Sequence, residues 1–146
     1  METQFQGTIP IMRIFDVGRA RDFYSGFLGF QVDWEHRTDD RSPAYLQVSS
    51  RGLVLHLTEH HGDCCPGATV FVWMTGIDDF HARITSRGYG YMKPSVETTS
   101  HQTRCVEVTD PFGNRIRFNE KLVEADASGD NPPGDGSGIL PCSADR

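Results

Sequence analysis

Several common protein classes are excluded by what this chain of 146 residues lacks. No apolar run approaches the roughly 20 residues of a membrane-spanning helix, and no basic start followed by an apolar stretch marks a secretory signal. Lys and Arg number only 14 against 20 Asp and Glu, so the net charge is −6 and polyanions are repelled. We therefore expect a cytoplasmic protein that binds neither nucleic acid nor membrane and that attracts cationic ligands.

Cysteines are few and show no disulfide framework. Cys64 and Cys65 are adjacent, Cys105 lies in an apolar alternating segment, and Cys142 lies in a polar one. We expect four reduced thiols, in keeping with a cytoplasmic location. A strained disulfide between Cys64 and Cys65 is a rarer alternative.

Familiar catalytic motifs are also missing. The chain has no G-x-S-x-G elbow, no phosphate-binding glycine loop and no H-E-x-x-H. The segment from Glu59 to Cys65, E-H-H-G-D-C-C, gathers metal-binding residue types, but its consecutive His and Cys pairs lack the gaps that let side chains converge on zinc. We expect a connector there, with a metal site as the alternative.

Two motifs dominate what is present. The run from Asp16 to Phe30, D-V-x-x-A-x-x-F-Y-x-x-x-L-G-F, predicts a capped amphipathic helix that ends at Gly29. The run from Thr109 to Phe118, T-D-P-F-G-N-R-I-R-F, predicts a turn at Asp110–Gly113 followed by a half-buried strand.

Apolar periodicity switches from two to about 3.6 and back in each half of the chain, which predicts a repeated βαβββ unit. The helix-ending glycines, Gly29 and Gly88, are 59 residues apart, and the hairpin glycines, Gly52 and Gly113, are 61 apart. Two such units give an α+β fold with a curved mixed sheet and a cleft. The predicted strands are 9–15, 31–36, 44–49, 53–58, 69–74, one near Tyr91, 103–108 and 115–119, and the predicted helices are 16–28 and 78–87.

The domain is expected to cover residues 1–124, with module one at 8–58 and module two at 68–120. From Ala125 the composition turns to Asp, Ser, Gly, Asn and Pro, which cannot bury enough apolar surface to offset chain entropy. Residues 125–146 are predicted to be a disordered polar tail.

The two motifs and the tandem βαβββ pattern resemble the vicinal oxygen chelate superfamily, which includes glyoxalase I, extradiol dioxygenases, fosfomycin-resistance enzymes and bleomycin-resistance proteins. The resemblance spans roughly Thr8 to Lys121. It implies four ligands around one divalent ion, at positions held here by Ile9, His56, a residue among Val70–Val72, and Arg117. Only His56 is a metal donor, so we expect neither a metal nor another cofactor.

Four local details resemble the bleomycin-resistance branch: T-I-P-I-M at Thr8–Met12, D-W at Asp33–Trp34, F-V-W at Phe71–Trp73, and the G-N-R-I-R-F ending. That branch implies a non-catalytic homodimer, with an N-terminal arm that crosses to the partner, which sequesters a cationic antibiotic. Where the branch has a further aromatic residue, this chain has Gln102. The predicted ligand-binding set is Asp33, Trp34, His56, Phe71, Trp73, Gln102, Arg104 and Arg117.

Each of these residues also has a structural interpretation. Trp34 and Trp73 also suit a core or a dimer interface, and His56 suits an interior position. Arg117 is either a pocket cation or the cross-strand partner of Glu107. Asp33, Glu35 and Asp39 supply carboxylates for a cationic ligand or form a solvated edge.

Three functions remain open: metal-independent antibiotic sequestration, which we favour, a glyoxalase-class lyase or isomerase or a dioxygenase-like enzyme, and a binding module for another metabolite. An enzyme would use His56 with Tyr45 or Glu107 as its acid and base. The favoured reading is a binding protein, not an enzyme.

Overall fold

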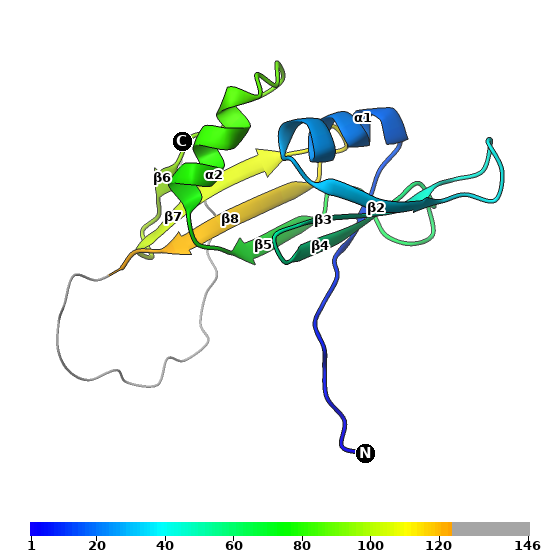
Figure 1. Cartoon of the computed structure of the whole chain (residues 1–146), viewed down its shortest axis with the longest axis horizontal. Coiled ribbons are helices and arrows are strands. Elements are labelled where there is room, and N and C mark those ends of the chain that lie inside the picture. Colours follow the sequence, from blue (N-terminus) through cyan, green and yellow to red (C-terminus); the bar gives the residue numbers. More distant parts are fainter. Residues whose placement is uncertain (124–146) are drawn as a thin grey trace.

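The computed structural model describes residues 1–123, which form two four-stranded mixed sheets with helices on one side (Figure 1). The strand orders are β1-β4-β3-β2 and β5-β8-β7-β6. The first strand of each unit pairs in parallel with the last, and the other neighbours are antiparallel. The predicted α+β fold class is confirmed. The predicted tail, 125–146, lies outside the described residues.

The strands follow the sequence pattern closely. Two of them, β2 and β4, have the predicted bounds, and most others differ by one or two residues at an end. The strands are β1 (Ile11–Arg13), β2 (Gln31–His36), β3 (Tyr45–Ser50), β4 (Leu53–Thr58), β5 (Thr69–Trp73), β6 (Glu97–Thr98), β7 (Thr103–Thr109) and β8 (Arg115–Lys121).

The first helix is divided into two parts. It begins as α1 (Val17–Arg21), where the Asp16 carboxylate accepts a hydrogen bond from the Arg19 amide at 2.7 Å, and continues as the π-helical turn η1 (Asp22–Phe27). Gly29 then takes a φ of +77°, and a Cβ there would lie 2.5 Å from the Arg87 guanidinium. The backbone conformation therefore favours glycine at this position, and a larger residue would also have to displace the end of the Arg87 side chain.

The second unit departs from prediction in one place. Its helix α2 (Ile77–Ser86) is shifted by one residue, and Gly88 follows it with a φ of +65°. The strand predicted near Tyr91 is wrong: this segment is a turn, and the short strand β6 lies six residues further along. With Gly88 and Gly90 on either side of Tyr89, the backbone is free to turn instead of extending.

The two units share one core on the helix side of the sheets. Inward residues of both sheets, such as Leu46, Leu55, Val106 and Ile116, pack with the buried faces of α1, η1 and α2 in a single cluster. Since side chains alternate along a strand, the residues between them project from the opposite faces. Those faces carry no helix (Figure 1). Each sheet thus has one buried and one open face.

The hairpin turn between β7 and β8 joins the two units. The buried Asp110 carboxylate accepts hydrogen bonds from the Tyr24 hydroxyl of η1 at 2.7 Å, from the Asn114 side chain at 2.8 Å, and from the amides of Phe112 and Asn114. Asn114 in turn donates to the Arg13 carbonyl and accepts from the Ala68 amide. Burial, followed by the charge and the hydrogen bond of Asp110, raises the pKa of Tyr24 well above its ordinary value. The D-P-F-G-N motif therefore provides a polar link between the units, in addition to their shared core.

The expectation of four reduced thiols is wrong at one position. Cys64 and Cys65 are free, so the alternative of a disulfide between them is not realised, whereas Cys105 on β7 is disulfide-bonded. The expectation for Cys142 concerns a residue outside the described part of the chain. Within residues 1–123, no helix is long and apolar enough to cross a membrane.

Candidate functional site

The open face of the first sheet carries a row of side chains that the strand register places side by side. Ile11 on β1 is opposite His56 on β4, His56 is opposite Gln47 on β3, and Gln47 is opposite Trp34 on β2. The first-sheet cluster is defined as Asp33, Trp34, Tyr45, Gln47 and His56.

A β-bulge in β2 brings two successive residues onto this face. The register shifts between Val32 and Trp34, so that Asp33 is the extra residue. Side chains normally alternate between faces, but a bulge re-aims one of them. Asp33 accordingly contacts Gln47 while Trp34 stacks on Tyr45. A carboxylate and an indole are thereby placed together on one surface.

A chain of hydrogen bonds links four members of this cluster, in the order Asp33, Gln47, His56 and Tyr45. The Asp33 carboxylate accepts from Gln47 Nε2 at 3.1 Å, which leaves Gln47 Oε1 facing His56 Nε2 at 3.0 Å. An amide oxygen can only accept, so His56 Nε2 carries a proton, and in the neutral imidazole Nδ1 then accepts from the Tyr45 hydroxyl at 2.8 Å. Both ring nitrogens of the neutral imidazole thus have a hydrogen-bond partner, and these partners favour one tautomer.

The aromatic rings of the cluster form a continuous surface. The Trp34 and Tyr45 rings lie 5.9 Å apart at an interplanar angle of 10°, and Trp34 meets the His56 ring edge to face at 5.4 Å. Trp34 remains 43% exposed, because the row lies on the face that carries no helix. A large indole left partly uncovered beside two other rings provides a flat, rigid contact surface.

The connector after β4 closes one side of the cluster. The Asp63 carboxylate accepts from the Thr58 hydroxyl at 2.6 Å, which folds the loop back towards Tyr45. Partial burial, followed by the nearby Asp63 and Cys64, raises the pKa of Tyr45. The Tyr45 phenol is therefore kept protonated and able to donate.

The second sheet has its own cluster, defined as Phe71, Trp73, Glu107 and Arg117. Phe71 is opposite Arg117 on β8, which is opposite Glu107 on β7. Arg117 Nε donates to the Glu107 carboxylate at 2.7 Å, so the predicted cross-strand pair is present. The Phe71 and Trp73 rings meet edge to face at 4.8 Å, and Trp73 is 55% exposed.

The remaining predicted ligand-binding residues lie elsewhere. Arg104 belongs to the helix-side set of β7, and its guanidinium pairs with Asp78 of α2 at 2.6 Å. Gln102 is in the turn before β7, with a φ of +57°, and its carbonyl accepts from the Leu122 amide. Neither side chain is brought to the first-sheet or second-sheet cluster. Alternation from Glu107 along β7 predicts the side on which Arg104 lies.

Two further residues were assigned differently by sequence reasoning. Gln47 was not predicted, although its alternation with Tyr45 on a strand facing His56 is a usable signal. Glu35, considered as a ligand carboxylate, instead pairs with Arg21 of α1 at 3.3 Å and with Arg37. In residues 1–123, no hydrogen bond, ion pair or ring contact connects the first-sheet and second-sheet clusters.

The donor set does not fit a divalent metal ion. Ile9, a residue among Val70–Val72, and Arg117 offer no donor at their superfamily positions, and both nitrogens of His56 are hydrogen-bonded within the protein. In the connector, Glu59 and Asp63 hold backbone and hydroxyl partners. Over residues 1–123, no group of three or more His, Cys, Asp or Glu side chains is gathered as a metal site would require.

Comparison with known proteins gives a family-model match described as glyoxalase superfamily protein, over residues 1–125. A search of curated proteins finds no match. Among solved structures, a bleomycin-binding protein complexed with bleomycin is 17% identical, with a TM-score of 0.64 over 80% of this chain and 99% of the other.

Two further structures are similar. A bleomycin resistance determinant encoded on the transposon Tn5 is 16% identical, with a TM-score of 0.65, covering 82% of this chain and 100% of the other. TnmS3, an antibiotic binding protein from Streptomyces sp. CB03234, is 22% identical, with a TM-score of 0.63, covering 82% and 99%. At these identities the likeness is one of fold.

Proposed function

The chain belongs to the glyoxalase superfamily, and we propose that within it this protein binds and sequesters a flat, aromatic, positively charged antibiotic of the bleomycin type, without a metal and without converting it. The antibiotic-binding neighbours in fold support this choice. Fold alone does not assign function, so the proposal depends on the open sheet faces.

The observation that carries the proposal is the pairing of an exposed indole with a carboxylate. Trp34 is 43% exposed and stacked on Tyr45, and the bulge places Asp33 beside it on the same face. A flat heteroaromatic group gains contact area on such a surface, while a cationic tail gains from Asp33. The net charge of −6 speeds the encounter with a cation.

The second-sheet cluster would supply the opposite wall of the ligand site in a homodimer. In one chain, both open faces expose large apolar side chains, among them Ile11, Trp34 and Trp73. The N-terminal arm extends away from the body, and its Phe5 is 97% exposed (Figure 1). A symmetric pair would cover these groups and set the face of one subunit against the face of its partner.

Light scattering checks the dimer directly. The expected molar mass is twice the 16.3 kDa of the chain. Deleting residues 1–7 should lower the measured mass towards that of a single chain, because the deletion removes the Phe5 contact with the partner subunit. A monodisperse single-chain mass for the full-length protein at high micromolar concentration would contradict the homodimer.

Calorimetric titration with metal-free bleomycin tests the function. We expect saturable binding, with a parallel change in tryptophan fluorescence, because the ligand would stack on Trp34. No heat and no fluorescence change at high micromolar ligand would reject the assignment. The ligand should also be recovered unchanged after release.

The hydrogen-bonded chain from Asp33 to Tyr45 favours a second candidate, an acid–base enzyme of the lyase or isomerase class. Tyr45 donates to His56 at 2.8 Å, and Asp33 acts through Gln47 to fix the imidazole tautomer. Such a relay can take a proton from a bound ligand onto the Tyr45 oxygen while the phenol proton moves to His56 Nδ1, and the reverse transfer can return a proton to another atom of the ligand. Turnover of a bound ligand in the titration above would favour this candidate over sequestration.

A further inference from the structure

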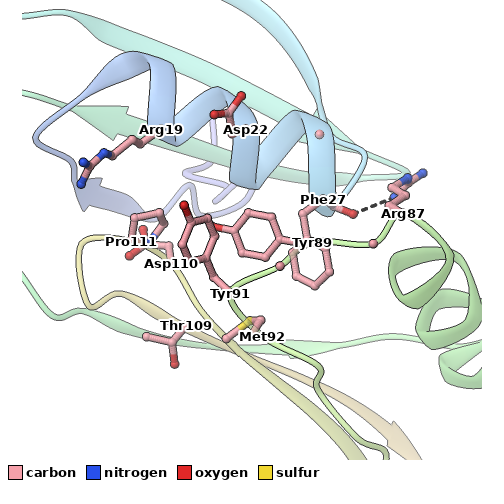
Figure 2. Close-up of a pocket in the computed structure, with 13 residues that line it drawn as sticks. Arg19, Asp22, Phe27, Arg87, Tyr89, Tyr91, Met92, Thr109, Asp110 and Pro111 are labelled. Carbon is pink, nitrogen blue, oxygen red and sulfur yellow. Dashed lines mark hydrogen bonds between the residues drawn. The ribbon is translucent and has the colours of Figure 1, made fainter.

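A groove lies on the helix side of the protein, between the first helix and the loops of the second unit (Figure 2). It has a volume of about 900 Å³ and runs between η1, the turn at 87–92 and the segment Thr109–Pro111. This is at the upper end of the range for small-molecule sites, roughly 300–1,000 Å³.

Aromatic rings form the centre of this groove. The Phe27 and Tyr89 rings are stacked at 4.7 Å and 22°, and Tyr91 meets Tyr89 at 5.3 Å and 60° (Figure 2). Met92 lies beside Tyr91. Tyr91 is 90% exposed, so its ring contributes almost no buried area to folding. Tyr91 presents an electron-rich ring to solvent, next to the partly buried ring of Tyr89.

Two carboxylates and two guanidiniums line the groove, and of these four groups it is the carboxylates, Asp22 and Asp110, whose charge acts on Tyr89. Asp22 and Asp110 both line the groove, and within residues 1–123 no ion pair neutralises either carboxylate. Arg87 is held back by its hydrogen bond to the Phe27 carbonyl, and Arg19 points away from the tyrosine rings (Figure 2). Burial raises the pKa of Tyr89, and Tyr91, Asp22 and Asp110 raise it further.

The π-helical turn accounts for the position of the Asp22 carboxylate. A π-helix has i→i+5 hydrogen bonds and is wound more loosely than an α-helix, so residues five apart are rotated less far from each other. Asp22 and Phe27 are five apart, open and close η1, and both line the groove. In a regular α-helix the two would be rotated further apart. Turns of this kind are frequently found at functional sites.

We propose that this groove is a second small-molecule site, for a flat aromatic cation that stacks on Tyr89 and Tyr91 with its positive charge towards Asp22. Electron-rich rings beside a carboxylate favour cations over neutral molecules of the same shape. The inference is independent of the sequestration proposed for the open sheet faces, since it uses different residues on the other side of the fold.

The test compares two fluorescent probes of nearly the same shape: 10-methylacridinium, a permanent cation, and acridine, which is uncharged at pH 8. We expect saturable binding of 10-methylacridinium and at least about tenfold weaker binding of acridine. Tyr91→Ala and Asp22→Asn should each weaken the binding of 10-methylacridinium by about tenfold or more. Tyr91→Phe, which keeps the ring, should bind it with an affinity within about threefold of the wild-type value.

Variants of the sheet faces separate this site from the other one. The double variant Trp34→Ala, Trp73→Ala should retain a component of 10-methylacridinium binding that Tyr91→Ala then abolishes. Tyr91 and Asp22 are exposed, so their substitutions leave the core unchanged, which circular dichroism can verify. The inference is overturned if the probe does not bind, if Tyr91→Ala and Asp22→Asn leave its affinity unchanged, or if binding disappears with the two tryptophans alone.

Discussion

Replacing Asp110 with alanine is expected to lower the free energy of unfolding by about 3–5 kcal/mol, a large share of the stability of a small domain. The Asp110 carboxylate accepts four hydrogen bonds in a buried position. Its removal strands the Tyr24 hydroxyl and two backbone amides, and each buried donor without a partner costs about 1–3 kcal/mol. Partial relaxation of the turn keeps the total below the sum.

The loss should be global, because the turn connects distant parts of the fold. Tyr24 lies in η1, while Asn114 holds both the Arg13 carbonyl at the end of β1 and the Ala68 amide before β5. Urea unfolding followed by circular dichroism measures the effect, and Asp110→Asn, which keeps the shape, provides a folded variant of intermediate stability.

Tyr24→Phe is the matched control for this experiment. It removes one hydrogen bond and leaves Asp110 with three donors, so a cost of about 1 kcal/mol is expected. If Asp110→Ala were as stable as Tyr24→Phe, the turn would not be the link between the two units, and their shared core would have to hold them together alone.

Local sequence patterns predicted most of the fold because local physics determines most of it. Asp16 caps the first helix, Gly29 and Gly88 end the two helices with positive φ, and the strand alternation in Leu53–Thr58 gives the observed bounds of β4. The strand predicted near Tyr91 was wrong because Gly88 and Gly90, on either side of Tyr89, favour a turn. The repeat is visible in the sequence itself, because equivalent glycines of the two units are separated by about 60 residues.

The site was less predictable, because it depends on departures from regular structure. Ideal alternation would put Asp33 and Trp34 on opposite faces, and only the bulge brings them together. In the same way, the π-helical turn changes the relative directions of Asp22 and Phe27 from those of a regular helix. Neither the extra residue of a bulge nor a π-helical turn has a strong local signature. By contrast, the pairing of Arg117 with Glu107 follows from register and was foreseeable.

Replacing Trp34 with alanine is expected to weaken the binding of metal-free bleomycin by at least about tenfold, or about 1.4 kcal/mol, while leaving the fold intact. The indole is 43% exposed and packs on Tyr45 and His56, so its loss removes ligand contact area without opening the core. Calorimetric titration of the variant measures the affinity, and urea unfolding should change by no more than about 1 kcal/mol.

Two variants distinguish stacking from a general effect on strand β2. Trp34→Phe keeps a smaller ring over Tyr45 and should lose less affinity than Trp34→Ala. Glu35→Ala truncates the next residue, which points to Arg21 on the helix side, and should leave the affinity unchanged. Equal weakening by Trp34→Ala and Glu35→Ala would indicate that β2 has been perturbed. An unchanged affinity in Trp34→Ala would contradict stacking of the ligand on the first-sheet cluster, because Trp34 is the exposed indole of that cluster.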